Sequence, residues 1–159
     1  MKAWHGYDMA EAQRRADPSA ERVRATAPDQ LISYAEADIG VVYVVGRGFW
    51  TGAMVDQHFH DLRRTATLAR RSSACVRVLV DLQHASVQSP AVAARIKQET
   101  RSIWTEQDRI AVVLQSALAK MQIDRIVDNG NHASFIAIED ARRWLGLRER
   151  ERLHAVASA

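Results

Sequence analysis

The stretch VRVLVDLQHASVQSPAVAARI, residues 76–96, decides the fold because it joins an apolar run to the start of a helix. The run VRVLVD (76–81) is typical of a strand that is covered on both faces, as the strands of parallel sheets are. We interpret the polar residues after it as a loop. Ser89 is a good N-cap and Pro90 a good first helical residue. A buried strand that passes into a helix is the repeating unit of an α/β protein.

Two β-rich runs and a helix are predicted before that unit. LISYAEA (31–37) and VVYVV (41–45) are joined by a short connection that contains glycine, which predicts a β-hairpin. A helix is expected to begin at about Thr51. Its apolar residues recur at i, i+4, i+7, i+11 and i+14 and therefore share one face. They are Val55, Phe59, Leu62, Ala66 and Ala69.

Strands and helices also alternate after residue 96. IAVVLQ (110–115) is predicted as a buried strand, and residues 116–130 as a helix that ends at Asn-Gly. SFIAI (134–138) is predicted as a last strand and EDARRWLG (139–146) as a last helix. The order is β-β-α-β-α-β-α-β-α, which predicts an α/β protein with a mixed, mostly parallel sheet and the opening hairpin at one edge.

One domain is expected, because 159 residues suffice for a single substantial core. Residues 31–147 carry the regular pattern. Residues 1–30 are expected to form a polar N-terminal extension, and residues 148–159 a C-terminal tail or a continuation of the last helix. Within that helix, Trp144 and Leu145 are expected to anchor it against the sheet.

The composition is that of a soluble globular protein, with 47% apolar and 26% charged residues. The net charge of +3 is weak evidence for a nucleic-acid partner, and we expect none. Cys75 is the single cysteine, so no internal disulfide can form. The first residues lack the apolar core of a signal peptide, and no stretch reaches the length of a membrane span. We therefore expect a cytoplasmic protein.

The element order and four short motifs resemble the STAS fold, the family of anti-sigma-factor antagonists and sulphate-transporter regulatory domains. The motifs are the entry into the first helix at 46–51, LVD at 79–81, RIAVV at 109–113, and F-x-x-x-E-D-A-x-x-W-L at 135–145. The chain looks closest to the small bacterial branch labelled STAS-like or CRAL-TRIO-like, over about residues 31–147. The resemblance implies a mixed sheet and a non-enzymatic role in binding a protein or a ligand.

One motif of the resembled family is missing. The antagonists carry Asp-Ser-Ser/Thr-Gly at the start of the helix after the third strand, where a kinase phosphorylates a serine. The matching residues here are Gln88, Ser89, Pro90 and Ala91, without the aspartate, the paired hydroxyls or the glycine. The resemblance alone therefore does not imply the family's phosphorylation switch for this chain, and the sequence leaves open whether a serine is phosphorylated.

The segment after the 76–81 run carries the residue types of a hydrolytic triad: Asp81, His84, Ser86 and Ser89. A triad depends on geometry, and residues this close in one loop rarely point at one another. The motif G-x-S-x-G is also missing. We expect Asp81 to end a strand, Ser86 to hydrogen-bond within the loop and Ser89 to cap the helix. These four residues stay a candidate interaction or switch loop, and no catalytic residue is expected.

The glycines of GRGFWTG suggest a dinucleotide fold, but their spacing is wrong. They read Gly46-x-Gly48-x-x-x-Gly52, whereas the fingerprint requires G-x-G-x-x-G. The next acidic strand end, Asp81, lies farther along than the fingerprint's acid, about 20 residues on. We expect these glycines to serve a turn from strand to helix, and no cofactor to bind there.

The first predicted helix carries a pair of histidines and a cluster of arginines, which are the residue types of metal-binding and anion-binding sites. His58 and His60 point in different directions on a helix, so they cannot share a metal, and we expect His58 near the buried boundary and His60 in solvent. A cluster of arginines follows, and it is a candidate patch for an anion or a partner: Arg63, Arg64, Arg70 and Arg71. A solvated helix face is the commoner explanation of such a cluster.

Two functions follow from these observations. The first is a non-catalytic, STAS-like regulatory module that binds a protein partner whose identity the sequence does not give. The alternative is a small-ligand protein that holds an apolar or nucleotide ligand between helices and sheet, with Met121 as a candidate lining residue. The sequence predicts no cofactor, no metal and no enzymatic activity. It is compatible with a homo-oligomer.

Overall fold

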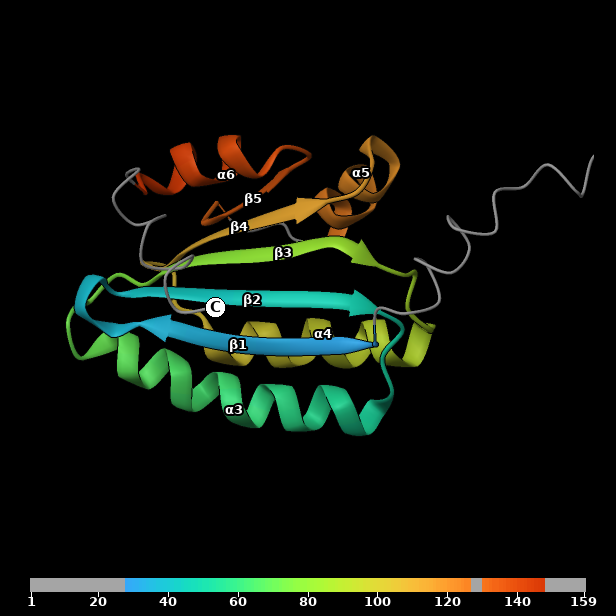
Figure 1. The fold of residues 1–159 in the computed structure, drawn as a ribbon, viewed down its shortest axis with the longest axis horizontal. Helices are drawn as coiled ribbons and strands as arrows, with labels where there is room; N and C mark the ends of the chain where they lie inside the picture. Colours follow the sequence, from blue (N-terminus) through green and yellow to red (C-terminus); the bar gives the residue numbers. More distant parts are fainter. Residues whose placement is uncertain (1–27, 127–129, 148–159) are drawn as a thin grey trace, which may run out of the picture.

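The computed structural model describes residues 28–126 and 130–147, which form a five-stranded sheet with helices on both faces (Figure 1). The strands lie in the sheet in chain order and are β1 (Gln30–Glu36), β2 (Val41–Gly48), β3 (Arg77–Ala85), β4 (Arg109–Leu114) and β5 (His132–Phe135). The helices are the short 3-10 helix η2 (Ala37–Ile39), then α3 (Gly52–Arg70), α4 (Pro90–Ile103), α5 (Ala117–Ile126) and α6 (Ile138–Leu145).

The predicted fold class and element order are confirmed. β1 and β2 form an antiparallel hairpin at one edge, and β2, β3, β4 and β5 pair in parallel. The hairpin turns through η2 and Gly40, whose φ of +64° suits a residue without a Cβ. A Cβ at Gly40 would also lie 2.5 Å from the Cβ of Ser73, so the turn packs directly on the segment that leads into β3.

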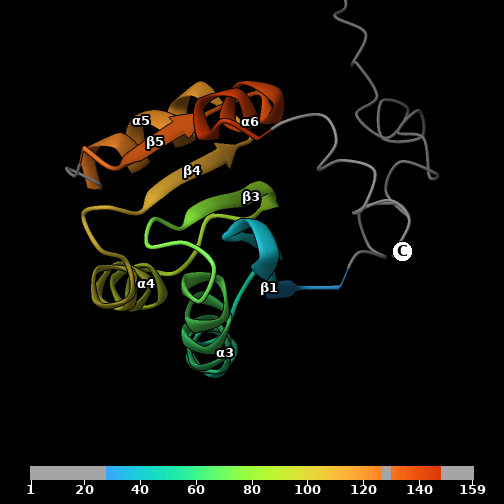
Figure 2. The same cartoon turned by 90° about the vertical axis from the view of Figure 1, so that its left-hand side faces the viewer.

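The strand order determines on which face the helices lie. Each new parallel strand is added on the same side of the previous one, and crossovers between parallel strands are almost always right-handed. Three such crossovers place α3, α4 and α5 on one face, and residues of all three helices pack into one core cluster there. α6 follows the last strand and covers the other face, against β3, β4 and β5 (Figure 2).

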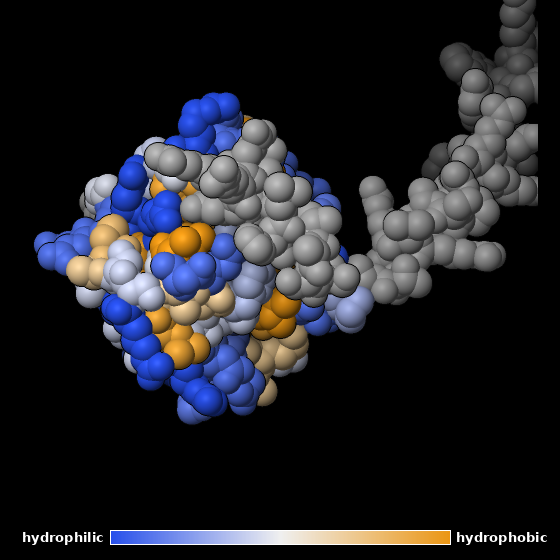
Figure 3. Space-filling view, turned by 60° about the vertical axis from the view of Figure 1, so that its left-hand side comes forward, coloured by the Kyte–Doolittle hydropathy of each residue, from blue (hydrophilic) through white to orange (hydrophobic). Residues whose placement is uncertain are grey.

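The larger core lies between the sheet and α3, where Val42, Val78 and Ile110 from the strands meet Val55 and Phe59. Burial of these side chains supplies most of the stabilising free energy of such a layer. None of the helices in residues 28–126 and 130–147 combines the length and apolar character that a membrane span requires. On the face shown in Figure 3, apolar residues form separate small patches between hydrophilic ones, as is ordinary for a surface in contact with water.

The smaller core lies under α6, and Leu145 anchors this helix with 1% of its surface exposed. Trp144 is only partly buried. Its ring lies 5.9 Å from that of Phe135, and the guanidinium of Arg109 stacks 4.2 Å from its centre. Both predicted residues therefore pack toward the sheet. Leu145 is the buried residue, and Trp144 is partly exposed and contacts Phe135 and Arg109.

Three predicted boundaries are wrong. β2, predicted as 41–45, extends to Gly48. Residues 82–85, predicted as a loop, continue β3, because they pair with the end of β2 after a register shift and place Leu82 and Ala85 against the core. β5 lies at 132–135 instead of 134–138, since Ile136 is exposed and Ala137 already precedes α6. The predicted end of the helix at Asn129 lies outside the described residues. So do residues 1–27 and 148–159, and the extension and tail stay predictions.

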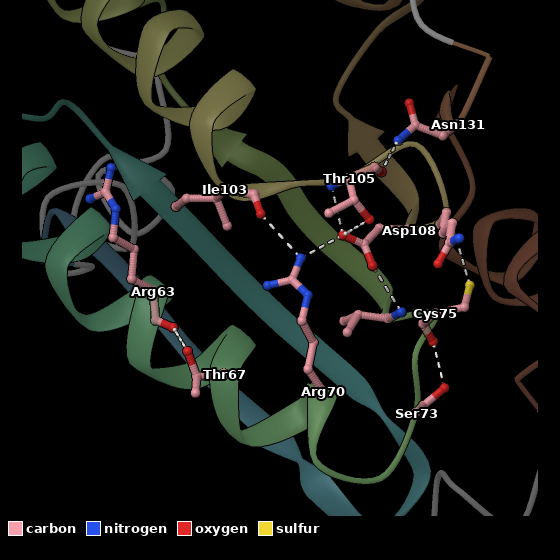
Figure 4. A network of polar contacts seen from close by, with 11 residues as sticks. Arg63, Thr67, Arg70, Ser73, Cys75, Ile103, Thr105, Asp108 and Asn131 are labelled. Atoms are coloured by element: carbon pink, nitrogen blue, oxygen red, sulfur yellow. Dashed lines mark hydrogen bonds and ion pairs between the residues drawn. The ribbon is translucent and has the colours of Figure 1, made fainter.

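A buried carboxylate fixes the end of the molecule where β3 and β4 begin (Figure 4). Asp108 is completely buried. It accepts hydrogen bonds from the backbone N–H of Val76 at 3.0 Å and of Thr105 at 2.8 Å, and from the Thr105 hydroxyl at 3.1 Å. The guanidinium of Arg70 lies 2.6 Å from the same carboxylate and also donates to the carbonyl of Ile103 at 3.1 Å. One side chain thus joins α3, α4, β3 and β4.

The surroundings of Asp108 favour its charged form. Burial alone raises the pKa of this carboxyl, but the backbone N–H groups of Thr105 and Val76 and the Arg70 guanidinium outweigh burial and lower its pKa below the usual range. A lowered pKa in the folded state means that the stabilisation is complete above the pKa of the unfolded chain. It is lost as the pH falls through the folded pKa.

We predict that Asp108→Asn lowers the free energy of unfolding by about 3 kcal/mol, because the amide cannot accept all these bonds and leaves Arg70 without its counter-charge. Urea unfolding at pH 7 measures this. Asp140→Asn is the matched control: its ion pair with Arg143 is exposed, and a change within about 0.5 kcal/mol is expected. Equal effects of the two substitutions would contradict the role assigned to Asp108.

Candidate binding groove between two helices

A groove runs between α4 and α5 over the carboxyl ends of β3 and β4, with a volume of about 990 Å³. We call it the α4–α5 groove. Its size lies at the upper end of the range of small-molecule sites in proteins. It extends along α4 from the carboxyl ends of β3 and β4, near Ala85 and Gln115, to the side where β4 and β5 begin, near Glu106 and His132.

The walls of the α4–α5 groove are mainly apolar. Large apolar side chains from the elements around the groove line it. Among them are Trp50 before α3, Leu82 of β3, Ile96 of α4, Trp104 after α4, Leu114 of β4 and Ile123 of α5. Several of these also pack against the larger core. The floor of the groove is therefore part of the folded core and is formed before any ligand arrives.

Trp50 is held in place by its own polar edge and by a glycine. Its indole N–H donates to the carbonyls of Gln30 at 3.0 Å and Arg47 at 2.9 Å, while only 4% of the residue is exposed. A Cβ at Gly46 would lie 2.5 Å from the indole ring and 2.7 Å from Leu82. Gly46 is thus required because the indole and Leu82 pack on bare backbone.

One glutamine organises the loop at the mouth of the groove. The side-chain oxygen of Gln88 accepts from the backbone N–H of Trp50 at 2.8 Å, and its amide donates to the carbonyls of Gly48 at 3.0 Å and Ser86 at 2.7 Å. The loop is therefore tied to the segment before α3. Val87, between these residues, remains 88% exposed.

α4 presents one stripe to the groove. Ala93, Ile96, Lys97, Thr100 and Arg101 line it, at i, i+3, i+4, i+7 and i+8. This spacing is one side of a helix, and Val92 and Ile103 lie on the buried side that packs into the core. The helix begins as predicted, with Ser89 as N-cap accepting from the N–H of Val92 at 3.3 Å and Pro90 following it.

The four candidate residues of the predicted loop do not converge. The expectation that Asp81 ends a strand is wrong: it lies within β3, and its carboxylate accepts from the N–H of Gln83 at 3.1 Å. His84 is exposed, Ser86 lines the α4–α5 groove and Ser89 caps α4. No hydrogen bond joins any two of them in the part of the chain that the structure describes. The arrangement does not form a catalytic triad.

The expectation that the glycines form a strand-to-helix turn holds only for the connection at 49–51, because Gly46 and Gly48 lie at the end of β2 and Gly52 is the first residue of α3. Gly46 admits Trp50, and Gly48 has a φ of +67° and a place where a Cβ would meet the carboxylate of Asp29 at 2.0 Å. That carboxylate accepts from the N–H of Phe49 at 3.0 Å and closes the turn. The glycines serve this packing, and their backbone N–H groups do not form the cradle of a dinucleotide fingerprint.

The two histidines of α3 lie where the sequence predicts. His58 is buried with 5% of its surface exposed, and His60 is exposed. Burial lowers the pKa of His58 to about 4, although the carboxylate of Asp61 and the backbone at Leu31 act in the opposite direction. Within residues 28–126 and 130–147, no group of three or more potential metal ligands comes together.

The predicted arginine patch is divided by its contacts. Arg63 pairs with Glu99 and Arg70 with Asp108. The side chains of Arg64 and Arg71 form no hydrogen bond or ion pair with the described residues, and together with Leu68 they border a shallow depression on α3. The patch as a candidate for an anion or a partner stays a prediction, now limited to these two arginines.

Sequence reasoning missed most of the α4–α5 groove. Trp50, Trp104 and Leu114 give no local pattern that distinguishes a groove wall from a core residue. Met121, the predicted lining residue, is exposed and lies outside the lining, whereas its neighbours Leu118 and Gln122 belong to it. A stripe of mixed apolar and basic residues on α4 was the signal that could have indicated this surface.

Comparisons with known proteins identify the fold. No family model matches the chain, and no curated protein matches it. Among solved structures, an uncharacterized protein of the DUF3478 family from Shewanella loihica, with a SpoIIAA-like fold, is similar with a TM-score of 0.54 and 16% sequence identity. The match covers 76% of this chain and 98% of that one. The chain thus has a SpoIIAA-like, or STAS-like, fold, as the sequence motifs predicted.

We predict that Ser89→Ala lowers the free energy of unfolding by about 1 kcal/mol, because α4 loses the side chain that accepts from the N–H of Val92. Ser89→Gly should cost only a few tenths of a kcal/mol, since glycine is itself an acceptable N-cap. Chemical denaturation of the two variants measures both. An alanine variant as stable as wild type would show that the cap contributes nothing.

A second prediction concerns acid. The pKa of His58 is lowered in the folded state, so between about pH 6.5 and pH 4 the unfolded chain binds a proton at this residue and the folded chain does not. The free energy of unfolding therefore falls as the pH drops through this window. The loss attributable to His58 reaches about 3 kcal/mol. His58→Gln should therefore flatten the pH dependence of stability in this window. The exposed His60→Gln should leave it as in wild type, and parallel curves for all three proteins would contradict the assignment.

Proposed function

We propose that the protein is a non-catalytic binding module that holds a small, mostly apolar molecule in the α4–α5 groove. The observation that carries this proposal is the groove itself, with its volume of about 990 Å³ and its floor of core side chains. An apolar hollow of this size in contact with water is unfavourable, and a ligand that fills it removes that apolar surface from water.

The way the walls are held supports a preformed site. Trp50 is fixed by two hydrogen bonds and by Gly46, and the loop at 86–88 is tied through Gln88. Leu82 and Leu114 belong to strands of the sheet. A ligand that enters such a site orders few side chains, so little of the binding free energy is spent on conformational entropy.

The polar residues support a binding role over a catalytic one. Asp81, His84, Ser86 and Ser89 form no chain of hydrogen bonds in which one residue could activate another. Ser86 alone of these four lines the groove. A reaction would need a second group within hydrogen-bond reach of that hydroxyl, and none of these residues supplies it.

The test uses N-phenyl-1-naphthylamine, an uncharged dye whose fluorescence rises in an apolar site. We predict saturable binding to the wild-type protein. Ala93→Phe should weaken it at least about tenfold, because Ala93 lines the groove and the larger side chain would occupy it. Tryptophan fluorescence should respond too, since Trp50 and Trp104 line the groove.

The matched control is the next residue of the same helix. Ala94 is also exposed but does not line the groove, so Ala94→Phe should leave the affinity within about twofold. Thermal melts of both variants confirm that they fold. Absence of saturable binding to wild type, or equal losses in the two variants, would refute the proposal.

Regulatory protein binding, which the resemblance implies, is the second candidate. The observation in its favour is Val87, a large apolar side chain that is 88% exposed at the loop before α4, where the resembled family carries its switch serine. Val87 also lines the α4–α5 groove, so a protein that contacts it would cover part of the groove lining as well. If this is right, Val87→Asp abolishes capture of a specific partner from lysate, while Ala94→Asp does not.

A further inference from the structure

We propose that the ligand of the α4–α5 groove is a free, single-chain amphiphile with a carboxylate head, a long-chain carboxylic acid, and that Lys97 binds the carboxylate. This inference rests on the proposed function, because it names the chemical class of molecule that the same groove takes. Four observations on the residues of the groove carry it.

The first observation is the division of the groove along α4. Ala93 and Ile96, nearer the start of the helix, are apolar, whereas Lys97, Thr100 and Arg101, nearer its end, are polar or basic. A molecule that lies along this stripe therefore contacts both apolar side chains and cationic and hydroxyl groups. That combination of contacts fits an amphiphile better than a uniformly apolar molecule.

The second observation is that the basic residues facing the groove lack partners. The side chains of Lys97 and Arg101 form no hydrogen bond or ion pair with residues 28–126 or 130–147. On the other side of the same helix, Arg95 is paired with both Asp56 and Glu99. The acids of this layer are thus used between α3 and α4, and the cations that face the groove remain available to an anionic ligand.

The third observation separates the two cations. Arg101 lies in the last turn of α4, where a positive charge is stabilised by the helix dipole without any ligand. Lys97 lies in the middle of the helix and lacks this explanation. It is also adjacent to Ile96, so its charged group and the apolar wall are neighbours. Lys97 is therefore the residue assigned to the carboxylate, with Thr100 one turn on as a hydroxyl donor.

The fourth observation limits the charge of the ligand. Glu106 also lines the groove, near the end of α4, so the lining carries two positive side chains and one negative. A head group with one negative charge matches the excess of one positive side chain. A head group with several negative charges would in addition be repelled by Glu106. The floor of the groove belongs to the folded core and its walls come from several elements, which suits one free chain that lies within it.

The experiment compares dodecanoate with 1-dodecanol, which share a chain length and differ in the charge of the head. Each displaces N-phenyl-1-naphthylamine from the wild-type protein below its own aggregation limit. We expect dodecanoate to bind about tenfold more tightly than dodecanol, the size of one hydrogen bond to a charged group. Lys97→Gln should remove this preference and leave the affinity for dodecanol unchanged.

The control removes the same charge from the neighbouring helix. Lys120 pairs with Asp124 at 2.7 Å and does not line the groove, so Lys120→Gln should keep the preference for dodecanoate. Equal affinities for the two ligands in wild type would overturn the carboxylate while the proposed function stands. Failure of the dye to bind would refute the proposed function itself. Binding to vesicles of anionic lipid without displacement by dodecanoate would overturn the free acid in favour of a membrane surface.

Discussion

The fold depends on one buried charge more than on any single apolar contact. Asp108 stands in the turn between α4 and β4, and its two oxygens bind the backbone of Val76 at the start of β3, the backbone of Thr105 and the guanidinium of Arg70. A buried carboxylate is costly unless each lone pair is used, so this site admits few arrangements. It sets where β3 and β4 begin, and thereby the register of the two central strands. The same contacts end α3 and α4, and the apolar core and the groove follow from that placement.

Local pattern was enough to predict the order of the elements. Three local signals predicted elements that the structure confirms: the apolar periodicity of α3, the N-cap at Ser89, and the apolar runs of β3 and β4. Each signal depends only on residues that are close together in the sequence. Asp108 could not be recognised in the same way. In the sequence TEQD it looks like one more polar residue of a turn, because its partners lie up to 38 positions away.

The candidate site was harder to predict than the fold for the same reason. The α4–α5 groove is made by side chains from seven separate segments of the chain, and Trp50 is both a core residue and a groove wall. The predicted loop at 82–85 is a strand because a register shift against β2 keeps Leu82 and Ala85 on the core. Neither tertiary pairing nor a bulge is encoded in a period of two. The polar residues between Asp81 and Ser89 therefore predict a loop, although the first of them belong to β3.

The strand order has a consequence for how the chain reaches this structure. The strands lie in the sheet in the order in which they occur in the chain. Each strand therefore pairs only with the strands directly before and after it in the sequence. Every parallel pairing closes a loop that contains a single helix. Closing such loops costs less entropy than joining distant segments, and contacts of short sequence separation accompany fast folding. The sheet can grow from the hairpin one strand at a time, and a ribosome releases the segments in that same order.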